Sequence, residues 1–136
     1  MPIDSDTRDK LLAAARDAMN HAYAPYSKFH VGAALRTADG KIFTGCNVEN
    51  ASYGLTICAE RNAIFAAVAA QPSGQKLAIQ AIAVATMPEI AAAPCGACRQ
   101  VIAEFAAPSG IDVFYHAAGG VKHSTIAALL PDSFSL

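Results

Sequence analysis

The sequence predicts an α/β domain in which helices cover a central sheet. Segments with helical periodicity alternate with segments of strand character, which is the pattern of a layered α/β domain. Two neighbouring strand candidates are joined by Ala38-Asp39-Gly40, an Asp-Gly turn typical of β-hairpins. A third candidate at residues 77–86 is apolar almost throughout, as expected for a central strand covered on both faces.

The N-terminal part is expected to form one helix followed by the hairpin. The helix should begin after a cap at Asp6 or Thr7 and continue to about His21. A proline-containing break separates it from the hairpin strands at 29–37 and 41–48. The apolar residues of the helix fall on one stripe that suits packing against a sheet: Leu11, Leu12, Ala15, Ala18, Met19 and Ala22.

The C-terminal part should alternate helices and strands. In order, the expected elements are a loop at 49–56, a helix at 58–70, the strand at 77–86, a helix at 95–105, a strand at 111–116, a turn at 117–120, a short strand and a short helix near 125–130. The helix at 58–70 is apolar nearly all round, which predicts burial on most of its sides. Pro94 opens the helix at 95–105, because proline is tolerated in a helix's first turn.

The composition favours a protein that acts on a small, weakly charged substrate and associates with copies of itself. The 136 residues suit a single domain, residues 1–136, and 54% of them are hydrophobic while only 15% are charged. The ten Lys and Arg are scattered, so the sequence offers no basic stripe for a nucleic-acid backbone. No apolar stretch reaches membrane-spanning length, and the short acidic N-terminus does not resemble a signal peptide. We expect a cytoplasmic protein with reduced cysteines, which contacts neither membrane nor nucleic acid.

Two short motifs predict a metal site with hydrolytic chemistry: Cys58-Ala59-Glu60 and Pro94-Cys95-Gly96-Ala97-Cys98. The three thiolates of Cys58, Cys95 and Cys98 suit one zinc ion and leave its fourth position open. Structural zinc sites are normally closed by four protein ligands, whereas catalytic sites keep a position for water. Glu60, beside the first ligand, supplies the proton acceptor and donor that hydrolysis needs. The motifs therefore predict one catalytic zinc per chain and hydrolytic deamination.

The ligands are expected at the starts of two helices, whose positive ends favour thiolates. Cys95 and Cys98 are three residues apart and share a helix face. Cys58 and Glu60 can reach one site only if both lie where the chain enters its helix. Arg61 is expected to donate to the sulfurs and draw off part of their charge. Cys46 could instead close a structural zinc site, although a plain core cysteine is the favoured interpretation.

Polar and aromatic residues near the hairpin suggest a binding surface. Asn47, Glu49 and Asn50 pair amides with a carboxylate, as buried sites for sugar hydroxyls do. The same residues also suit a polar strand end with turn residues, and both interpretations remain open. Three aromatic residues could pack on a flat base or belong to the core: Tyr26, Phe29 and Tyr53.

The motifs resemble those of a known family. Zinc nucleobase deaminases carry an H-x-E…P-C-x-x-C signature, and this chain has its all-cysteine variant. Beyond that, the chain resembles the small homotetrameric cytidine deaminases over nearly its full length. Six segments carry the resemblance: 23–27 (YAPYS), 29–34 (FHVGAA), 45–51 (GCNVENA), 58–61 (CAER), 94–100 (PCGACRQ) and 129–134 (LLPDSF).

The resemblance implies a three-layer α/β/α fold with a mixed five-stranded sheet. It implies an enzyme of pyrimidine salvage that deaminates cytidine and 2'-deoxycytidine to uridine and 2'-deoxyuridine with release of ammonia. In this family pattern Cys58, Cys95 and Cys98 bind zinc, Glu60 transfers protons and Arg61 bonds the zinc cysteines.

The resemblance also implies how the nucleoside is bound. Asn47 and Glu49 should bind the ribose hydroxyls, Phe29 should pack along the nucleoside, and the backbone near Ala59 should contact the pyrimidine edge. Two further residues should reach the active site of a neighbouring subunit in a homotetramer: Tyr53 and Phe134.

Departures from the family pattern leave alternatives open. His30 stands where the family usually has proline, and Ala93 stands where serine or threonine commonly precedes the Pro-Cys motif. One alternative is a deaminase of a modified aminonucleoside, against which the Asn47 and Glu49 pair argues. Another is a non-catalytic, zinc-stabilised oligomer, which predicts four protein ligands. A nucleic-acid deaminase is opposed by the missing basic groove.

Overall fold

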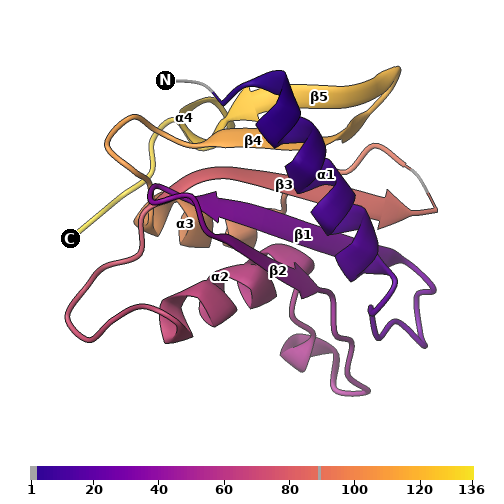
Figure 1. Ribbon diagram of the computed structural model, residues 1–136. Coiled ribbons are helices and arrows are strands. Elements are labelled where there is room, and N and C mark those ends of the chain that lie inside the picture. The colour runs from indigo at the N-terminus through magenta and orange to yellow at the C-terminus, as the bar shows by residue number, and fades with distance from the viewer. Residues whose placement is uncertain (1–2, 89) are drawn as a thin grey trace.

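The computed structural model describes residues 3–88 and 90–136, and its elements alternate as the sequence predicts. Figure 1 shows them in order: α1 (Ser5–Met19), β1 (His30–Thr37), β2 (Ile42–Cys46), the 3-10 helix η1 (Tyr53–Leu55), α2 (Ala59–Ala69), β3 (Ile79–Met87), α3 (Gly96–Glu104), β4 (Asp112–Ala117), β5 (Gly120–Thr125) and α4 (Ile126–Leu129). None of these helices is long and apolar enough to cross a membrane.

The strands form one mixed five-stranded sheet in the order β2-β1-β3-β4-β5. Strands β3 and β4 pair in parallel, and every other neighbouring pair is antiparallel. The parallel pair requires a crossover, which α3 supplies. The mixed sheet implied by the family resemblance is confirmed.

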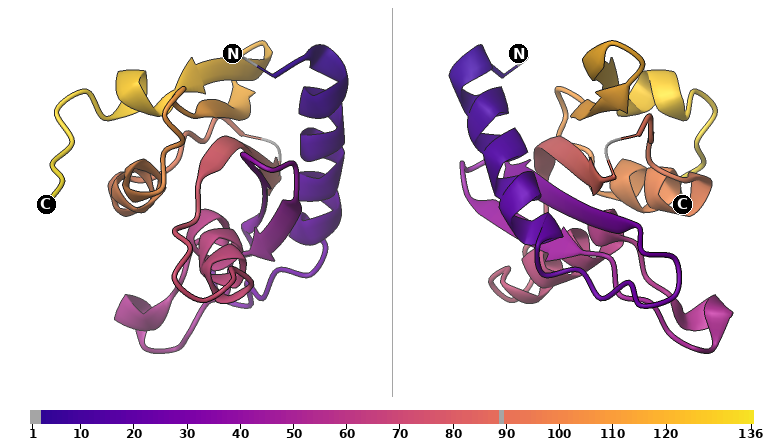
Figure 2. Two further views of the ribbon diagram at one scale, coloured as in Figure 1. Left: turned by 60° about the vertical axis from the view of Figure 1, so that its left-hand side comes forward. Right: turned by 90° about the vertical axis from the view of Figure 1, so that its right-hand side faces the viewer.

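Helices cover both faces of the sheet and give three layers (Figure 2). Helix α1 lies on one face, over small residues of β1 and β3 such as Ala34 and Ala83. Helices α2 and α3 lie on the other face, where Ile64 and Ile102 pack against Leu35 and other apolar residues of the sheet. The nearly continuous apolar character of β3 follows from this double cover.

Helix α1 confirms the predicted stripe as far as Met19, where the helix ends, but not the predicted cap; Ala22 lies beyond the helix and is half-buried. Its buried residues are Leu11, Leu12, Ala15, Ala18 and Met19. The cap is Asp4, whose Oδ1 accepts the Thr7 N–H at 2.8 Å, so the helix begins at Ser5 and the expected cap at Asp6 or Thr7 is wrong. Because a cap bonds the N–H groups two or three residues after it, a cap at Asp4 satisfies the N–H groups of an earlier turn and the helix begins earlier than predicted.

Helix α2 is less buried in this chain than its composition predicts. Ala59, Ala63 and Ile64 are fully buried, but the side of the helix away from the sheet exposes Phe65 (49%) and Val68 (42%). The expectation of burial on most sides is therefore wrong for the single chain. One side of α2 stays exposed because the sheet and α3 cover only part of the helix circumference.

Two glycines allow the helices to approach the sheet closely. A Cβ at Gly32 would lie 2.0 Å from the Ala15 carbonyl oxygen of α1. A Cβ at Gly45 would lie 2.4 Å from the Ala63 nitrogen and 2.7 Å from the Ala59 oxygen of α2. Side chains of any size at these positions would force each helix away from its strand.

Replacing Gly45 by alanine should destabilise the protein by about 1–3 kcal/mol, because the new methyl group collides with the α2 backbone. Urea denaturation of Gly45→Ala measures the loss. Gly54→Ala is the matched control, since no atom lies within 4 Å of a Cβ built there. Equal stability of the two variants would contradict the proposed close packing.

Candidate active site

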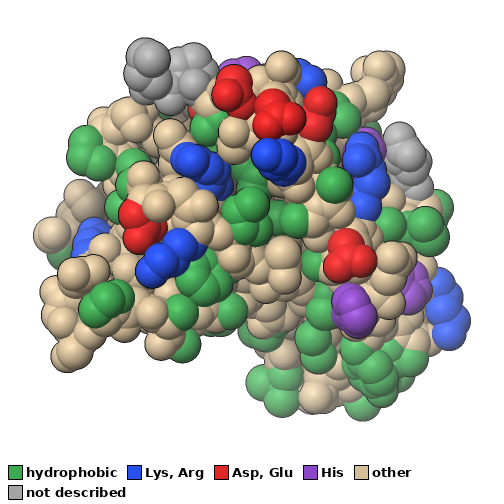
Figure 3. All heavy atoms as spheres, viewed as in Figure 1, with side chains coloured by type: hydrophobic (Ala, Val, Ile, Leu, Met, Phe, Trp, Pro, Cys, Tyr) green, Lys and Arg blue, Asp and Glu red, His purple; other side chains and the backbone are tan. Residues whose placement is uncertain are grey.

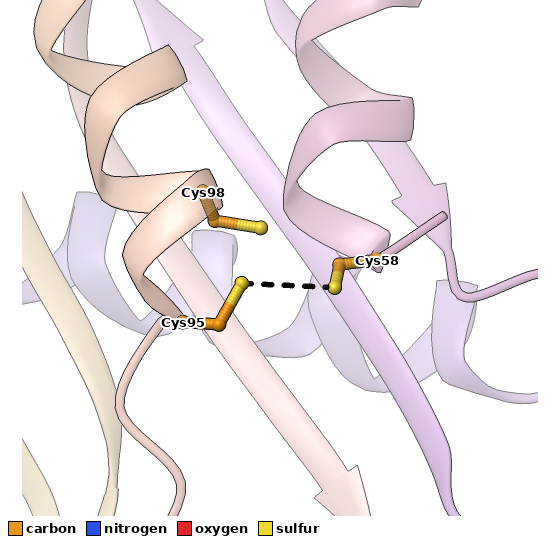
Figure 4. Close-up of side chains that lie close together, drawn as sticks. All are labelled: Cys58, Cys95 and Cys98. Carbon is orange, nitrogen blue, oxygen red and sulfur yellow. Dashed lines mark hydrogen bonds between the residues drawn. The ribbon is translucent and has the colours of Figure 1, made fainter. Parts of the chain in front are cut away.

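Three cysteines meet at one point of the structure. The Sγ atoms of Cys58, Cys95 and Cys98 all lie within 4.8 Å of one another, and those of Cys58 and Cys95 are 3.9 Å apart. Figure 4 shows their side chains pointing into one space between the first turns of α2 and α3. The three residues proposed from the two motifs are thus brought together by the fold.

Both helices begin at this cluster. Cys58 is the N-cap of α2 and Cys95 is the N-cap of α3, while Cys98 lies in the first turn of α3. Cys58 has extended backbone angles (φ −70°, ψ 155°), so it and Glu60 lie where the chain enters the helix. This geometry removes the difficulty that residues two apart within a helix do not share a face.

The pKa values of two of the three thiols, Cys58 and Cys98, are shifted from their ordinary range. The pKa of Cys58 is lowered to about 5, because its thiolate accepts a hydrogen bond from the Cys98 thiol and lies beside the Arg61 guanidinium. The pKa of Cys98 is raised, because its thiol donates to Cys58 and is buried. A divalent metal would ligate these sulfurs as thiolates.

The donor set fits zinc with one open position. Three sulfur ligands suit the tetrahedral zinc ion. Among residues 3–88 and 90–136, this is the only group of three or more Cys, His, Asp or Glu placed to hold a metal. Cys46 lies outside the group on β2, half-buried, and its backbone carbonyl accepts the Asn62 side-chain N–H at 2.8 Å. The alternative of Cys46 as a fourth ligand is therefore not supported.

Arg61 extends from the first turn of α2 to the cluster. Its Nη2 donates to Cys58 Sγ at 3.4 Å, and this bond raises the pKa of the guanidinium. The residue that sequence reasoning assigned to the sulfurs therefore lies beside one of them. A fixed positive charge at this place offsets part of the negative charge of the thiolates.

Glu60 is a buried carboxyl next to the cluster. Only 5% of the residue is exposed, and burial raises the pKa of its carboxyl, with the neighbouring Cys58 charge adding to the effect. A carboxyl with a raised pKa takes up and returns a proton more readily near neutral pH than an exposed one. Its place at the first turn of α2 holds it within the same cavity as Cys58 and Cys95.

A cavity of about 330 Å³ opens in front of the cysteines, a size suited to a small molecule. Five of the residues proposed for substrate or proton transfer line it, namely Phe29, Asn47, Glu49, Ala59 and Glu60. The other lining residues are Ser27, Val31, Thr56, Cys58, Val84, Thr86, Ala92, Ala93 and Cys95. The cavity thus joins the cysteine cluster to the polar end of β2.

Glu49 is held by the turn that precedes β1. Its Oε1 accepts the backbone N–H groups of Tyr26 (3.0 Å) and Ser27 (3.2 Å), and its Oε2 accepts the Ser27 hydroxyl. The Ser27 hydrogen bond is the main cause of a lowered pKa for this carboxyl. A carboxylate offers about four accepting positions, so Glu49 keeps room for one further hydroxyl.

Asn47 bridges two backbone groups of the same region. Its Oδ1 accepts the Val31 N–H at 2.9 Å, and its Nδ2 donates to the Phe29 carbonyl at 2.8 Å. One N–H of the amide is left for a ligand. Asn47 and Glu49 therefore fix a strand end, as one sequence interpretation holds, and they also line the cavity, so the interpretation as a binding site stays a prediction.

Two proposed residues are not part of this cavity. Tyr53 is 83% exposed on η1, and Phe134 is 70% exposed near the C-terminal end of the sequence given. Conversely, sequence reasoning assigned no role to Ser27, Thr56 or Thr86, which line the cavity. Ser27 lies within segment 23–27, one of the segments that carry the family resemblance, and this was the one sequence feature that pointed to a role for it.

Comparisons with known proteins agree with this geometry. Residues 5–113 match the family model described as the cytidine and deoxycytidylate deaminase zinc-binding region. A cytidine deaminase of Sporosarcina psychrophila is 47% identical over 127 residues, which cover 93% of this chain and 90% of that protein. A cytidine deaminase of Halalkalibacterium halodurans is 44% identical over 129 residues, 94% of each protein.

Solved structures match the fold as well as the sequence. The crystal structure of cytidine deaminase from Burkholderia pseudomallei has a TM-score of 0.81 and 50% identity, covering 93% of this chain and 98% of that one. That of Mycobacterium tuberculosis has a TM-score of 0.77 and 38% identity over 98% of this chain and all of that one. Together with the three thiols and the matched family model, these likenesses show that the chain belongs to the cytidine deaminase family.

Proposed function

We propose that this protein is a zinc-dependent hydrolase that deaminates cytidine and 2'-deoxycytidine to uridine and 2'-deoxyuridine with release of ammonia, a reaction of pyrimidine salvage. The observation that carries the proposal is one cavity lined by two of the three clustered cysteines, Cys58 and Cys95, by the buried carboxyl of Glu60 and by the polar side chains of Asn47 and Glu49. Relatives matched over nine-tenths of the chain are named cytidine deaminase.

The cysteine cluster and Glu60 form the catalytic end of the cavity. Cys58, Cys95 and Cys98 hold one zinc ion, which polarises water for hydrolysis when it is bound. Glu60 accepts a proton from the attacking water and delivers it to ring N3. It then accepts the proton of the hydroxyl added at C4 and delivers it to the amino group, which leaves as ammonia when the C4–N bond breaks and the C4 carbonyl forms. Its buried position and raised pKa support these transfers. Arg61 keeps the cysteine charge balanced through its bond to Cys58.

The other end of the cavity holds the nucleoside. Phe29 packs along the nucleoside, and the backbone at Ala59 contacts the pyrimidine edge. Asn47 donates to a ribose hydroxyl and Glu49 accepts from one, using the positions that their own backbone contacts leave open. All four residues line the cavity, which supports this arrangement.

A homotetramer completes the site in this proposal. Tyr53 and Phe134 are exposed and outside the cavity of their own chain, so each is free to enter the site of a neighbouring subunit. Phe65 and Val68 form an apolar surface on α2 that another subunit would bury.

We assign residues 1–136 to a single deaminase domain in the cytoplasm, where thiols stay reduced and able to bind metal. The substrate is a free nucleoside. On the face shown in Figure 3, Lys and Arg side chains lie among acidic ones over α1, where Arg8 pairs with Asp9 and Lys10 with Asp6. Such a surface lacks the continuous basic track that nucleic-acid binding requires.

Replacing Glu60 by glutamine should lower kcat for cytidine by at least about 10²–10⁴-fold, because the carboxyl that transfers protons is lost. Loss of cytidine absorbance and release of ammonia measure turnover, with zinc content as the control for an intact metal site. Near-normal turnover of zinc-loaded Glu60→Gln would refute the catalytic assignment. Turnover of a modified aminonucleoside but not of cytidine by the unmutated protein would identify the alternative substrate class.

Removing zinc with a chelator should abolish deamination and expose the Cys58 and Cys95 thiols to a thiol reagent, while Cys98 stays buried in the chain, and added zinc should reverse both effects. The reason is that Cys58, Cys95 and Cys98 form the cluster whereas Cys46 lies apart from it. Protection of Cys46 by zinc as well would instead indicate a closed structural site.

A charge on the exposed face of α2 should dissociate the tetramer. Sedimentation equilibrium should give about four times the chain mass of 14.1 kDa for the unmutated protein and a smaller species for Phe65→Glu. Ala13→Glu, on an exposed position of α1, is the matched control and should stay tetrameric. A monomer before mutation would contradict the shared site.

A further inference from the structure

Ser27 has a position that the roles assigned so far do not explain. It lies in the turn between α1 and β1 and lines the cavity that Cys58 and Cys95 also line. A serine in an exposed turn commonly bonds only its own backbone neighbours. Here its hydroxyl makes such a local bond, to the backbone of Phe29, and also bonds the distant side chain of Glu49, so that it joins two residues proposed to contact the nucleoside.

The Ser27 hydroxyl acts as donor and acceptor at once. It donates to Oε2 of Glu49, which is 22 residues distant in the sequence. It also accepts the backbone N–H of Phe29 at 3.0 Å. A hydroxyl can serve both roles because it carries one proton and two lone pairs.

The two oxygens of Glu49 are held by different kinds of donor. Oε1 is bound by the backbone N–H groups of Tyr26 and Ser27, which any residue at position 27 except proline would preserve. Oε2 is bound by the Ser27 side chain alone among the contacts of the described residues. The hydroxyl therefore fixes the oxygen that retains the open accepting position.

The hydroxyl does not contact the chemical end of the site. The cysteines and Glu60 belong to the first turns of α2 and α3, and no hydrogen bond of the described residues links them to Ser27. A change at Ser27 should therefore act on the nucleoside end of the cavity and leave proton transfer unaffected.

We propose that Ser27 is a positioning residue for sugar recognition, which aligns Glu49 and Phe29 through one hydroxyl. The inference rests on the proposed function, because it takes Glu49 as an acceptor for a nucleoside hydroxyl. Without the Ser27 hydroxyl, Oε2 of Glu49 loses its donor while Oε1 keeps its two backbone N–H donors, and the Phe29 N–H loses its acceptor. Affinity for the sugar then falls, while the base and the catalytic carboxyl keep their places.

The experiment compares substrates with and without sugar hydroxyls. In Ser27→Ala, kcat/KM for cytidine should fall about tenfold, the usual effect of losing one hydrogen bond to a charged group. For 2',3'-dideoxycytidine, which lacks both hydroxyls on the lower sugar edge, the fall should be within about threefold. The loss for cytidine should appear in KM and not in kcat, as expected for binding lost equally from ground and transition states.

Two variants separate the hydroxyl from general effects of the turn. Ser27→Thr keeps a hydroxyl and should retain kcat/KM for cytidine within about threefold of the unmutated protein. Ser73→Ala removes a hydroxyl from an exposed turn after α2 and should change nothing. Zinc content and thermal unfolding show that each variant is folded and loaded.

The outcomes distinguish this inference from the proposed function. An equal loss for cytidine and dideoxycytidine in Ser27→Ala, or a Ser27→Thr variant as impaired as Ser27→Ala, would overturn the positioning role. Failure of the unmutated protein to deaminate cytidine would refute the proposed function instead. Calorimetric titration with uridine tests the inference without turnover. A roughly tenfold weaker affinity in Ser27→Ala supports it, and an unchanged affinity overturns it.

Discussion

The close approach of two helix N-termini is the constraint on which the site depends. Cys58 and Cys95 each precede the first turn of a helix, so α2 and α3 must begin side by side for the thiols to share one ion. The sheet enforces this, because α2 packs on β2 and β1 while α3 connects the parallel strands β3 and β4. Gly45 allows α2 to approach its strand. A shift of one helical turn, about 5.4 Å, would exceed the 4.8 Å within which the sulfurs gather.

The same helix ends explain the electrostatics of the cluster. Sulfur anions this close would repel one another, but each lies at the positive end of a helix and Cys58 also receives a bond from Arg61. Glu60 is buried beside them, although burial favours its neutral form. Stability alone would not favour a carboxyl there, since burying an ionisable group is costly without a paired charge. The proton transfer proposed for Glu60 would give this carboxyl a reason to be there.

The sequence predicted the parts of the structure that depend on local spacing. The strands, the helices and the placing of both Cys motifs at helix starts follow from periodicity and short-range rules. The cap of α1 was wrong because Asp4 and Asp6 have the same capping chemistry and propensity does not choose between them. The exposure of Phe65 was missed because an apolar helix can be covered by its own chain or by another subunit. The role of Ser27 depends on a partner 22 residues away, which spacing cannot reveal.

The two ends of the cavity are built on different principles. The cysteines, Glu60 and Arg61 are carried by helix turns whose positions are set by packing against the sheet, and such groups stay in place when a loop changes. The nucleoside end is built from the turn before β1 and the end of β2, where Asn47 and Glu49 use most of their bonding capacity to hold the backbone. Only their remaining donor and acceptor positions are left for a ligand. In the proposed function, selectivity for the sugar depends on the residues that orient those few positions, so it can vary while the chemistry at the helix ends is preserved.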